Sequence, residues 1–254
     1  MDTHFVYFSP TNTTKDVLHT MFGGSSFGLR IVEHDLTDSQ HSGVQMDFSM
    51  EDLTIWGIPV YSGRVPKVAI DRFRNLSGNK TPAILVATYG NRNYDDALIE
   101  LYDILTLQGF VVIAAAAIVA EHSVVRRIAV GRPNTTDRSV IRDFAETIMS
   151  KELPRKLDTP LKGNRPYCKY QSVPFKPKAN NKCIYCGLCV KLCPVNAISK
   201  EEPKCTNKSI CISCMRCVRF CQKGARGFSK VEEYIAYKFI SKKCREEKEN
   251  TLFI

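Results

Sequence analysis

The feature that most constrains the fold of this 254-residue chain is a cysteine motif that occurs twice in its last third. The cysteines of each copy are separated by two, two and three residues, and the second copy begins 28 residues after the first. They are Cys183, Cys186, Cys189 and Cys193, and then Cys211, Cys214, Cys217 and Cys221. Ala197 and Ala225 occupy equivalent places, so the segment is an internal duplication with the spacing of metal ligands.

The spacing indicates iron–sulfur clusters. Three thiolates separated by two residues surround one corner of a cubane cluster, and the fourth cysteine is directed to the cluster of the other repeat. A pair of zinc sites is the alternative, but zinc ribbons separate two Cys-x2-Cys pairs by a longer loop and lack the third and fourth cysteines. We therefore predict two [4Fe–4S] clusters, the first completed by Cys221 and the second by Cys193.

All 11 cysteines lie after residue 160, and the charge changes at the same place. Residues 1–160 carry 16 basic and 19 acidic side chains, whereas residues 161–254 carry 20 basic and 7 acidic ones. This contrast predicts two domains. Cys168, Cys205 and Cys244 lie outside the motif, and we expect them to be thiols that bind no metal.

No targeting or membrane segment is evident. The N-terminus lacks the basic region and cleavage site of a secretory signal. The longest apolar run, residues 111–120, is about half of what a membrane-spanning helix needs. In a reducing compartment, dense cysteines indicate metal or redox chemistry. We expect a soluble, cytoplasmic protein without membrane insertion.

Apolar strands alternate with amphipathic helices in the first 150 residues. The pattern predicts five strands, at residues 4–8, 29–34, 53–56, 83–87 and 110–119. It predicts helices at residues 16–22, 65–73, 95–108 and 137–149. Such alternation is typical of a doubly wound α/β fold, in which helices cover both faces of a parallel five-stranded sheet.

Three loops follow strands of this sheet and have the composition of a flavin mononucleotide (FMN) site. Hydroxyls and backbone N–H groups at a helix N-terminus suit a phosphate, although such a loop is also an ordinary helix cap. Aromatic residues and a glycine suit an isoalloxazine ring, although each tyrosine has loop packing as its alternative. The candidate residues are Ser9, Thr11, Asn12, Thr13 and Thr14 in the first loop, Pro59, Val60, Tyr61, Ser62, Gly63 and Arg64 in the second, and Thr88, Tyr89, Gly90, Asn91, Arg92, Asn93, Tyr94 and Asp95 in the third.

The three loops resemble those of flavodoxins, and residues 182–230 resemble bacterial-type two-cluster ferredoxins. Together they resemble the EFR-family flavodoxin–ferredoxin fusion proteins, which occur chiefly in anaerobic prokaryotes. Two positions depart from these patterns: Asn12 stands where flavodoxins usually have glycine, and Gln222 where ferredoxins usually have proline. The resemblance implies a flavodoxin-like FMN-binding domain at 1–153 and a small α+β ferredoxin domain with two [4Fe–4S] clusters at 182–230. A proline-rich linker or arm at 154–181 joins them, and a C-terminal helix at 231–249 begins the 231–254 tail.

These modules predict an electron-transfer protein that passes electrons between FMN and the clusters to or from a redox partner. The alternative is a terminal FMN-dependent reductase in which the clusters feed a small organic substrate at the flavin, oriented by His122, Arg64 or Asn91. For His122, a catalytic proton donor and a structural histidine are the two interpretations. A redox-sensing regulator is a third hypothesis. No G-x-G-x-x-G follows a strand, so the sequence does not support an NAD(P)H domain.

The basic C-terminal half predicts an acidic partner. Two oxidised clusters, each about −2 with its thiolates, lower the charge of residues 161–254 from +13 to about +9. The surplus suits an acidic redox protein or, in part, the acidic first half of this chain. The sequence has no nucleic-acid recognition motif, so we expect no nucleic-acid partner.

Overall fold

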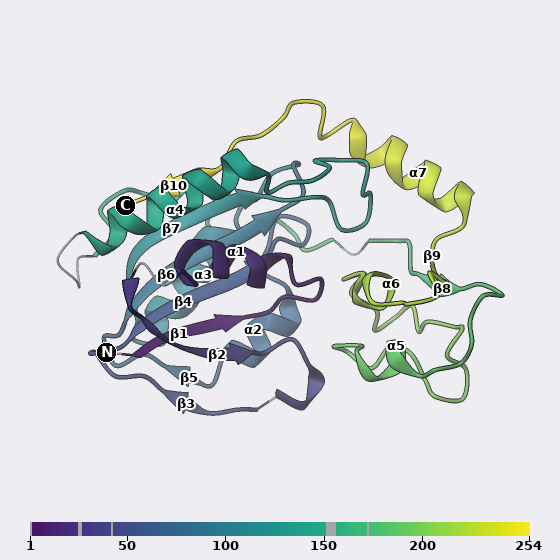
Figure 1. Cartoon of the computed structure of the whole chain (residues 1–254), viewed down its shortest axis with the longest axis horizontal. Coiled ribbons are helices and arrows are strands. Elements are labelled where there is room, and N and C mark those ends of the chain that lie inside the picture. Colours follow the sequence, from purple (N-terminus) through teal and green to yellow (C-terminus); the bar gives the residue numbers. More distant parts are fainter. Residues whose placement is uncertain (1, 25–26, 42, 151–155, 172) are drawn as a thin grey trace.

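The computed structural model describes residues 2–24, 27–41, 43–150, 156–171 and 173–254 (Figure 1). Its main sheet has the strand order β10-β7-β6-β4-β1-β2. The strands are β1 (Asp2–Tyr7), β2 (Arg30–Asp35), β4 (Leu53–Pro59), β6 (Pro82–Tyr89), β7 (Val111–Val119) and β10 (Thr251–Phe253). All neighbours pair in parallel except β10, which is antiparallel to β7. The five parallel strands are the predicted ones, and the flavodoxin-like doubly wound fold is confirmed.

Helices cover both faces of the sheet. They are α1 (Thr13–Phe22), α2 (Lys67–Phe73), α3 (Ala97–Leu107) and α4 (Thr135–Met149). Leu18 of α1 and Phe144 of α4 pack on the face that carries Ile55. Phe73 of α2 packs on the opposite face, against Trp56. Ile55 and Trp56 are adjacent in β4 and both fully buried, which explains why this strand reads as a continuous apolar run.

The C-terminus corrects the sequence prediction in two respects. Helix α7 (Lys230–Ser241) ends eight residues before the predicted end at residue 249, and the chain then returns to the flavodoxin-like domain as β10. The sheet therefore has six strands, not five. Asn250 fixes the return, because its Oδ1 accepts a hydrogen bond from the N–H of Val119 at 2.9 Å. A strand of three residues is too short to show an alternation of apolar and polar residues in the sequence, and only its pairing with β7 defines it.

A second small sheet, made of β3 (Met46–Asp47) and β5 (Leu76–Ser77), lies beside the main one. The segment that we predicted as a linker, residues 154–181, contacts the first domain between residues 157 and 171, whereas its Lys178 and Ala179 pair with a strand of the cysteine-rich part. Residues 154, 155 and 172 lie outside the described part. The hydroxyl of Ser62 donates to the carbonyl of Gln171 at 2.7 Å. Asp96 accepts hydrogen bonds from the N–H groups of Asn164 and Cys168. The arm therefore crosses the second candidate flavin loop.

The cysteine-rich part contains α5 (Leu188–Lys191), α6 (Arg216–Arg219), and a two-stranded sheet of β8 (Lys178–Ala179) and β9 (Arg226–Gly227). The two repeats share backbone conformation as well as sequence. Positive φ angles recur at an offset of 28 residues: 56° and 55° at Tyr185 and Ser213, 74° and 62° at Gly187 and Met215, and 53° and 54° at Asn196 and Gly224. In Figure 1 this part lies beyond the carboxyl ends of β1 and β2, on the side to which their arrows point.

Within the described residues, no helix is both long and apolar enough to span a bilayer.

Candidate cofactor sites

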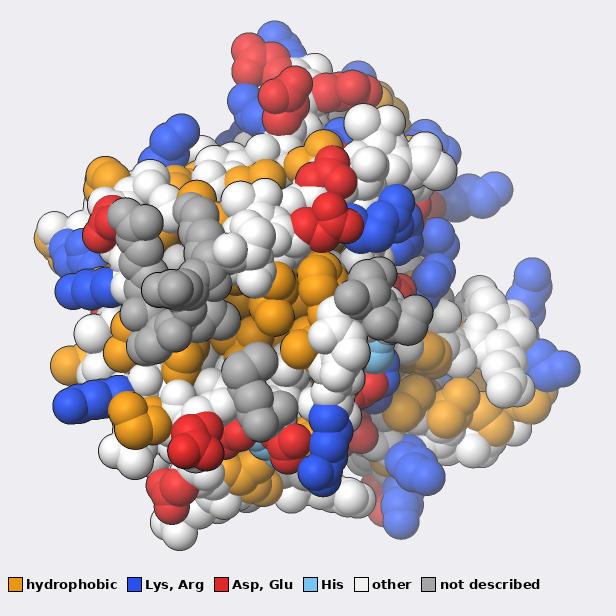
Figure 2. Space-filling model, turned by 60° about the vertical axis from the view of Figure 1, so that its left-hand side comes forward, with side chains coloured by type: hydrophobic (Ala, Val, Ile, Leu, Met, Phe, Trp, Pro, Cys, Tyr) orange, Lys and Arg blue, Asp and Glu red, His pale blue; other side chains and the backbone are white. Residues whose placement is uncertain are grey.

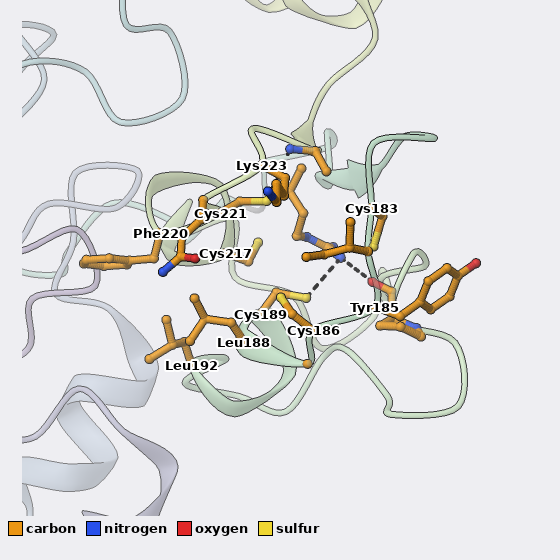
Figure 3. Close-up of a pocket in the computed structure, with 16 residues that line it drawn as sticks. Cys183, Tyr185, Cys186, Leu188, Cys189, Leu192, Cys217, Phe220, Cys221 and Lys223 are labelled. Atoms are coloured by element: carbon orange, nitrogen blue, oxygen red, sulfur yellow. Dashed lines mark hydrogen bonds between the residues drawn. The ribbon is translucent and has the colours of Figure 1, made fainter.

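The structure brings Cys183, Cys186, Cys189 and Cys221 together around one cavity (Figure 3). The cavity has a volume of about 60 Å³, and Cys217 and Arg226 are among its other lining residues. Cys183, Cys186 and Cys189 belong to the first motif and Cys221 to the second, and Cys217 is the neighbouring cysteine that the spacing assigns to the other cluster. This is the combination that the crossed pattern of ligands requires, and we call it the outer site.

The other four cysteines form a second group, which we call the inner site. Cys214 lies within electrostatic range of Cys217, Cys193 and Cys211. Burial raises the pKa of the Cys214 thiol well above its usual range and that of Cys217 to about 11. Thiolate ligands at such positions need compensating positive charge, which bound iron supplies.

The fourth cysteine of each motif accepts a hydrogen bond from the alanine four residues after it. The N–H of Ala197 donates to Cys193 Sγ at 3.1 Å, and the N–H of Ala225 donates to Cys221 Sγ at 3.2 Å. The alanines that mark the duplication in the sequence thus have the same structural role in both copies. A hydrogen bond to sulfur stabilises the charged form, as expected around the thiolates of an iron–sulfur cluster.

Buried arginines test whether these sites fit an anionic group. Arg72, Arg216 and Arg226 are all buried, and the Nε of each lacks a hydrogen-bond partner within the described residues. Arg216 pairs with Asp38 at 3.3 Å, whereas neither Arg72 nor Arg226 pairs with a carboxylate in the described part of the chain. Arg72 donates to backbone carbonyls, including that of Pro194 at 2.6 Å, next to inner-site Cys193. A buried cation without a carboxylate is costly unless another anion balances it. Clusters with four thiolates carry that negative charge, so the residues fit them. No group of three or more His, Cys, Asp and Glu side chains in the described chain is arranged to hold a single metal ion.

The two cysteine sites differ in their surroundings. Burial and the nearby thiols of Cys214 and Cys211 raise the pKa of Tyr61, which lies in the second flavin loop. Ile212 packs against the core of the first domain. The inner site therefore faces the flavodoxin-like domain. At the outer site, Cys186 is exposed and Tyr185 is 60% exposed. Figure 3 shows Tyr185 on the side away from the purple N-terminal ribbon.

The first candidate loop fits a phosphate. Asn12 adopts the left-handed conformation, with φ of 64°, and its side chain does not cap α1. Asparagine tolerates this conformation, which explains how it replaces the usual glycine. The Oγ of Ser9 accepts a hydrogen bond from the N–H of Lys15 at 3.1 Å, and the hydroxyls of Thr11 and Thr13 are 3.2 Å apart. The helix N-terminus and three hydroxyls suit an anion.

The three candidate loops meet at the carboxyl ends of adjacent strands β1, β4 and β6. The hydroxyls of Thr14 and Thr88 are 2.7 Å apart, and the N–H of Val60 donates to the carbonyl of Thr88 at 2.8 Å. The carbonyl of Gly63 accepts from the N–H of Asp96 at 2.9 Å. Gly63 has φ of 80° and leaves no room for a Cβ beside Asp95, so this turn requires glycine.

The third loop has a partner that the sequence did not reveal. The carboxamide of Asn91 donates to the carbonyls of Cys244 and Glu246 and accepts from the N–H of Lys248. The hydroxyl of Tyr89 donates to the carbonyl of Glu249 at 3.1 Å, and Tyr94 packs on Tyr89. Both tyrosines are buried. The C-terminal segment therefore covers part of this loop. Of the three predicted tyrosines, only Tyr61 is partly exposed.

The charged residues of the second and third loops are also engaged. Arg64 forms a two-pronged ion pair with Glu100, at 2.7 and 2.6 Å, and donates to the carbonyl of Cys168. Arg92 pairs with Asp95, whose N–H donates to the side-chain oxygen of Asn93. These contacts hold the shape of the loops.

His122 lies against Gly90, where an added Cβ would come within 2.7 Å of the imidazole. Its Nδ1 accepts hydrogen bonds from the N–H groups of Val124 and Val125, at 3.2 and 3.1 Å. The ring is thus neutral, with its proton on Nε2, and it orders the turn after β7. A proton-donor role for His122 stays a prediction.

His122 should make the first domain sensitive to acid. Burial lowers the pKa of His122 from 6.5 to about 4, and Arg92 contributes in the same direction. The unfolded chain therefore takes up a proton near pH 6.5 while the folded one does not, and stability is lost as the pH falls between those values. Between pH 7 and 4, the wild-type protein should lose about 2–3 kcal/mol more unfolding free energy than His122→Asn, measured by urea denaturation. Parallel pH profiles for the two proteins would contradict this role.

The three cysteines outside the motif lie apart from both cysteine sites. Cys168 lies beside Ser62 and Gly63, and burial and Asp96 raise its pKa. Cys205 is exposed, and the thiol of Cys244 is 3.9 Å from the carbonyl of Gly90.

Comparison with known proteins agrees with this division of the chain. The family model Fer4, a 4Fe-4S binding domain, matches residues 178–199. No curated protein matches the chain. A flavodoxin of Streptococcus pneumonia TIGR4 is 17% identical, with a TM-score of 0.43, over 60% of this chain and 100% of its own. An FMN-dependent NADH-azoreductase of Bacillus anthracis, solved with FMN, is 10% identical, with a TM-score of 0.40, over 58% of this chain and 99% of its own. The Fer4 match supports a 4Fe-4S binding region in the cysteine-rich part, next to the α/β fold that the sheet topology defines.

Proposed function

We propose that this chain is an electron-transfer iron–sulfur flavoprotein of the EFR kind, with FMN at the three loops and a [4Fe–4S] cluster at each cysteine site. When bound, each cluster carries one electron at a time, and FMN carries one or two. Ser9, Thr11 and Thr13, with the N-terminus of α1, would hold the phosphate. Tyr61 and the loop around Gly90 would border the ring.

The observation that carries the proposal is the order of the three sites. The inner-site segment at Cys211 and Cys214 lies against Tyr61, and Arg216 of the same repeat donates to the carbonyl of Pro10 in the phosphate loop at 3.2 Å. The outer site faces away from this junction. The chain therefore holds an outer cysteine site, an inner one and the flavin loops in a series, which suits transfer between a docked protein and the flavin.

The reductase alternative receives less support from the same loops. It needs side chains that are free to orient a substrate, and Arg64, Asn91 and His122 were the candidates. In the structure, Arg64 is bound to Glu100, and the carboxamide of Asn91 holds the C-terminal segment. The Nδ1 of His122 accepts two backbone N–H groups. Because these polar atoms already bind other parts of the chain, they are not free to orient a substrate, and this favours an electron carrier over a reductase.

We propose that the partner is an acidic redox protein that docks at the outer site. Ile184 and Tyr185 are exposed beside Cys186, and the Lys204 ammonium lies 5.1 Å from the Tyr185 ring centre. Lys223 lines the same cavity. On the lobe at the right of Figure 2, the charged side chains in view are mainly Lys and Arg, beside hydrophobic ones. Exposed apolar side chains flanked by these two lysines would suit an acidic partner surface.

Stopped-flow reoxidation of the loaded, reduced protein tests the proposal. We expect an acidic ferredoxin or flavodoxin to reoxidise the protein quickly. The rate should fall as salt rises from about 0.05 to 0.5 M, because salt screens the attraction. A quinone and an azo dye, used as small organic acceptors, should bind weakly and not saturate. Tight, saturable turnover of a small acceptor would instead establish a reductase, and a rate independent of salt would exclude docking on the lysines.

A further inference from the structure

Arg226 places a buried guanidinium between the two cysteine sites. Its Nη1 lies 3.8 Å from the sulfur of Cys189, an outer-site cysteine. Cys217, an inner-site cysteine, lines the same cavity as Arg226 and lies within electrostatic range of it. Arg226 is only 5% exposed. One cation therefore contacts a sulfur of the outer site and lies close to one of the inner site.

The duplication places an apolar residue at the position equivalent to this arginine. Ile198 is the equivalent residue of the first repeat, since each lies five positions after the fourth cysteine. Ile198 is buried to the same extent, at 3% exposure, and packs with Cys193 and Ala197. The same place in the same backbone thus accepts an apolar side chain in one copy and a charged one in the other.

The other contacts of Arg226 do not neutralise it. Nη1 donates to the carbonyl of Pro203 at 2.6 Å, and Nη2 to the carbonyl of Pro177 at 2.9 Å and to the hydroxyl of Thr206. Within the described residues no carboxylate pairs with it, and its Nε has no partner. A buried cation of this kind is costly unless an anion lies close to it. The sulfurs of the two sites are the anions in reach.

We infer that Arg226 is a shared electrostatic residue that raises the reduction potentials of both clusters. Reduction adds one electron, and so one negative charge, to a cluster. A fixed cation next to the ligand sulfurs stabilises that added charge, more strongly when both are buried. Because Arg226 lies close to a sulfur of each site, its charge should act on both clusters. The inference rests on the proposed pair of clusters.

The test is a redox titration of the anaerobically loaded full-length protein, with dithionite as the electron donor and electron paramagnetic resonance as the readout. Arg226→Gln removes the charge and keeps hydrogen-bond donors, and Arg226→Lys keeps the charge. Arg219→Gln is the matched control, since Arg219 is exposed on α6 and loses the same charge. We expect Arg226→Gln to shift both midpoint potentials to more negative values, and Arg226→Lys and Arg219→Gln to shift them much less.

Iron content is measured first, so that the cluster assignment is judged separately. Wild-type protein that binds about four irons, not about eight, would refute the assignment itself. With about eight irons bound, unchanged potentials in Arg226→Gln, a shift of one cluster alone, or a shift no larger than that of Arg219→Gln would each overturn the inference. Loss of iron in both the glutamine and the lysine variants would make Arg226 a folding residue and overturn it too. Loss in the glutamine variant alone, with the lysine variant loaded at wild-type potentials, would support a requirement for the charge.

Discussion

Replacing Cys221 by alanine is expected to remove the cluster of the outer site, although Cys221 belongs to the second motif. The iron content of the reconstituted protein should fall from about eight to about four per chain. The physical reason is that Cys221 lines the same cavity as Cys183, Cys186 and Cys189. FMN should remain bound, because the three flavin loops lie in the other domain. Iron analysis and flavin absorbance after anaerobic reconstitution measure both results.

Double variants distinguish crossed sites from independent ones. If the sites are crossed, Cys186→Ala with Cys221→Ala removes two ligands of one cluster, and about four irons remain. Cys186→Ala with Cys193→Ala removes one ligand from each cluster, and both should be lost. If each motif instead binds its own cluster, Cys186→Ala with Cys221→Ala should lose both clusters, and Cys186→Ala with Cys193→Ala should keep about four irons. Cys205→Ala is the control, since this exposed cysteine lies outside the motif and its loss should leave about eight irons.

The second large effect is expected at the phosphate loop, where Thr13→Asp should weaken FMN binding by about fivefold to a thousandfold. The hydroxyl of Thr13 lies 3.2 Å from that of Thr11, at the N-terminus of α1. A carboxylate about 4 Å from a phosphate costs about 1–4 kcal/mol, depending on how well water screens the charges. Fluorescence titration of the flavin-free protein measures the dissociation constant, and iron content should not change.

The matched control is Thr136→Asp, at an exposed position in the first turn of α4. An acid in the first turn of a helix is favourable, so neither substitution should harm its helix. The control should bind FMN like the wild type. Equal FMN affinity in Thr13→Asp and wild type would contradict a phosphate site at this loop, and equal losses in both variants would indicate a general effect of charge.

Local signals in the sequence were sufficient for the parallel sheet, and they predict the grouping of the cysteines. In β4, Ile55 and Trp56 face opposite sides of the sheet, and a continuous apolar run is the mark of a strand buried on both faces. The cysteine spacing is equally local, because short separations limit which thiols share a site. The prediction failed at residues 242–249, which we predicted as the last turns of a helix; the helix ends at Ser241, and residues 251–253 pair with β7.

The candidate flavin loops were located from strand ends, but their contacts were not. Asn91 and Tyr89 have the composition expected of a flavin loop, and the structure engages both with residues more than 150 positions later. The residues near Asn91 in the sequence do not indicate that it binds the C-terminal segment. The same is true of Arg64, whose ion pair with Glu100 depends on how α3 packs.

The cysteine repeat by itself determined that the last third of this chain is a duplication, and its short, fixed separations predict two cysteine sites. It also indicated that the fourth cysteines exchange partners. The tertiary structure alone decided which site is buried against Tyr61 and which is exposed, and it placed Arg226 between them where the first repeat has Ile198. Ligand spacing is a property of neighbouring residues. Burial and electrostatic environment arise only when distant segments pack together, so the difference between the two sites appears only in the folded chain.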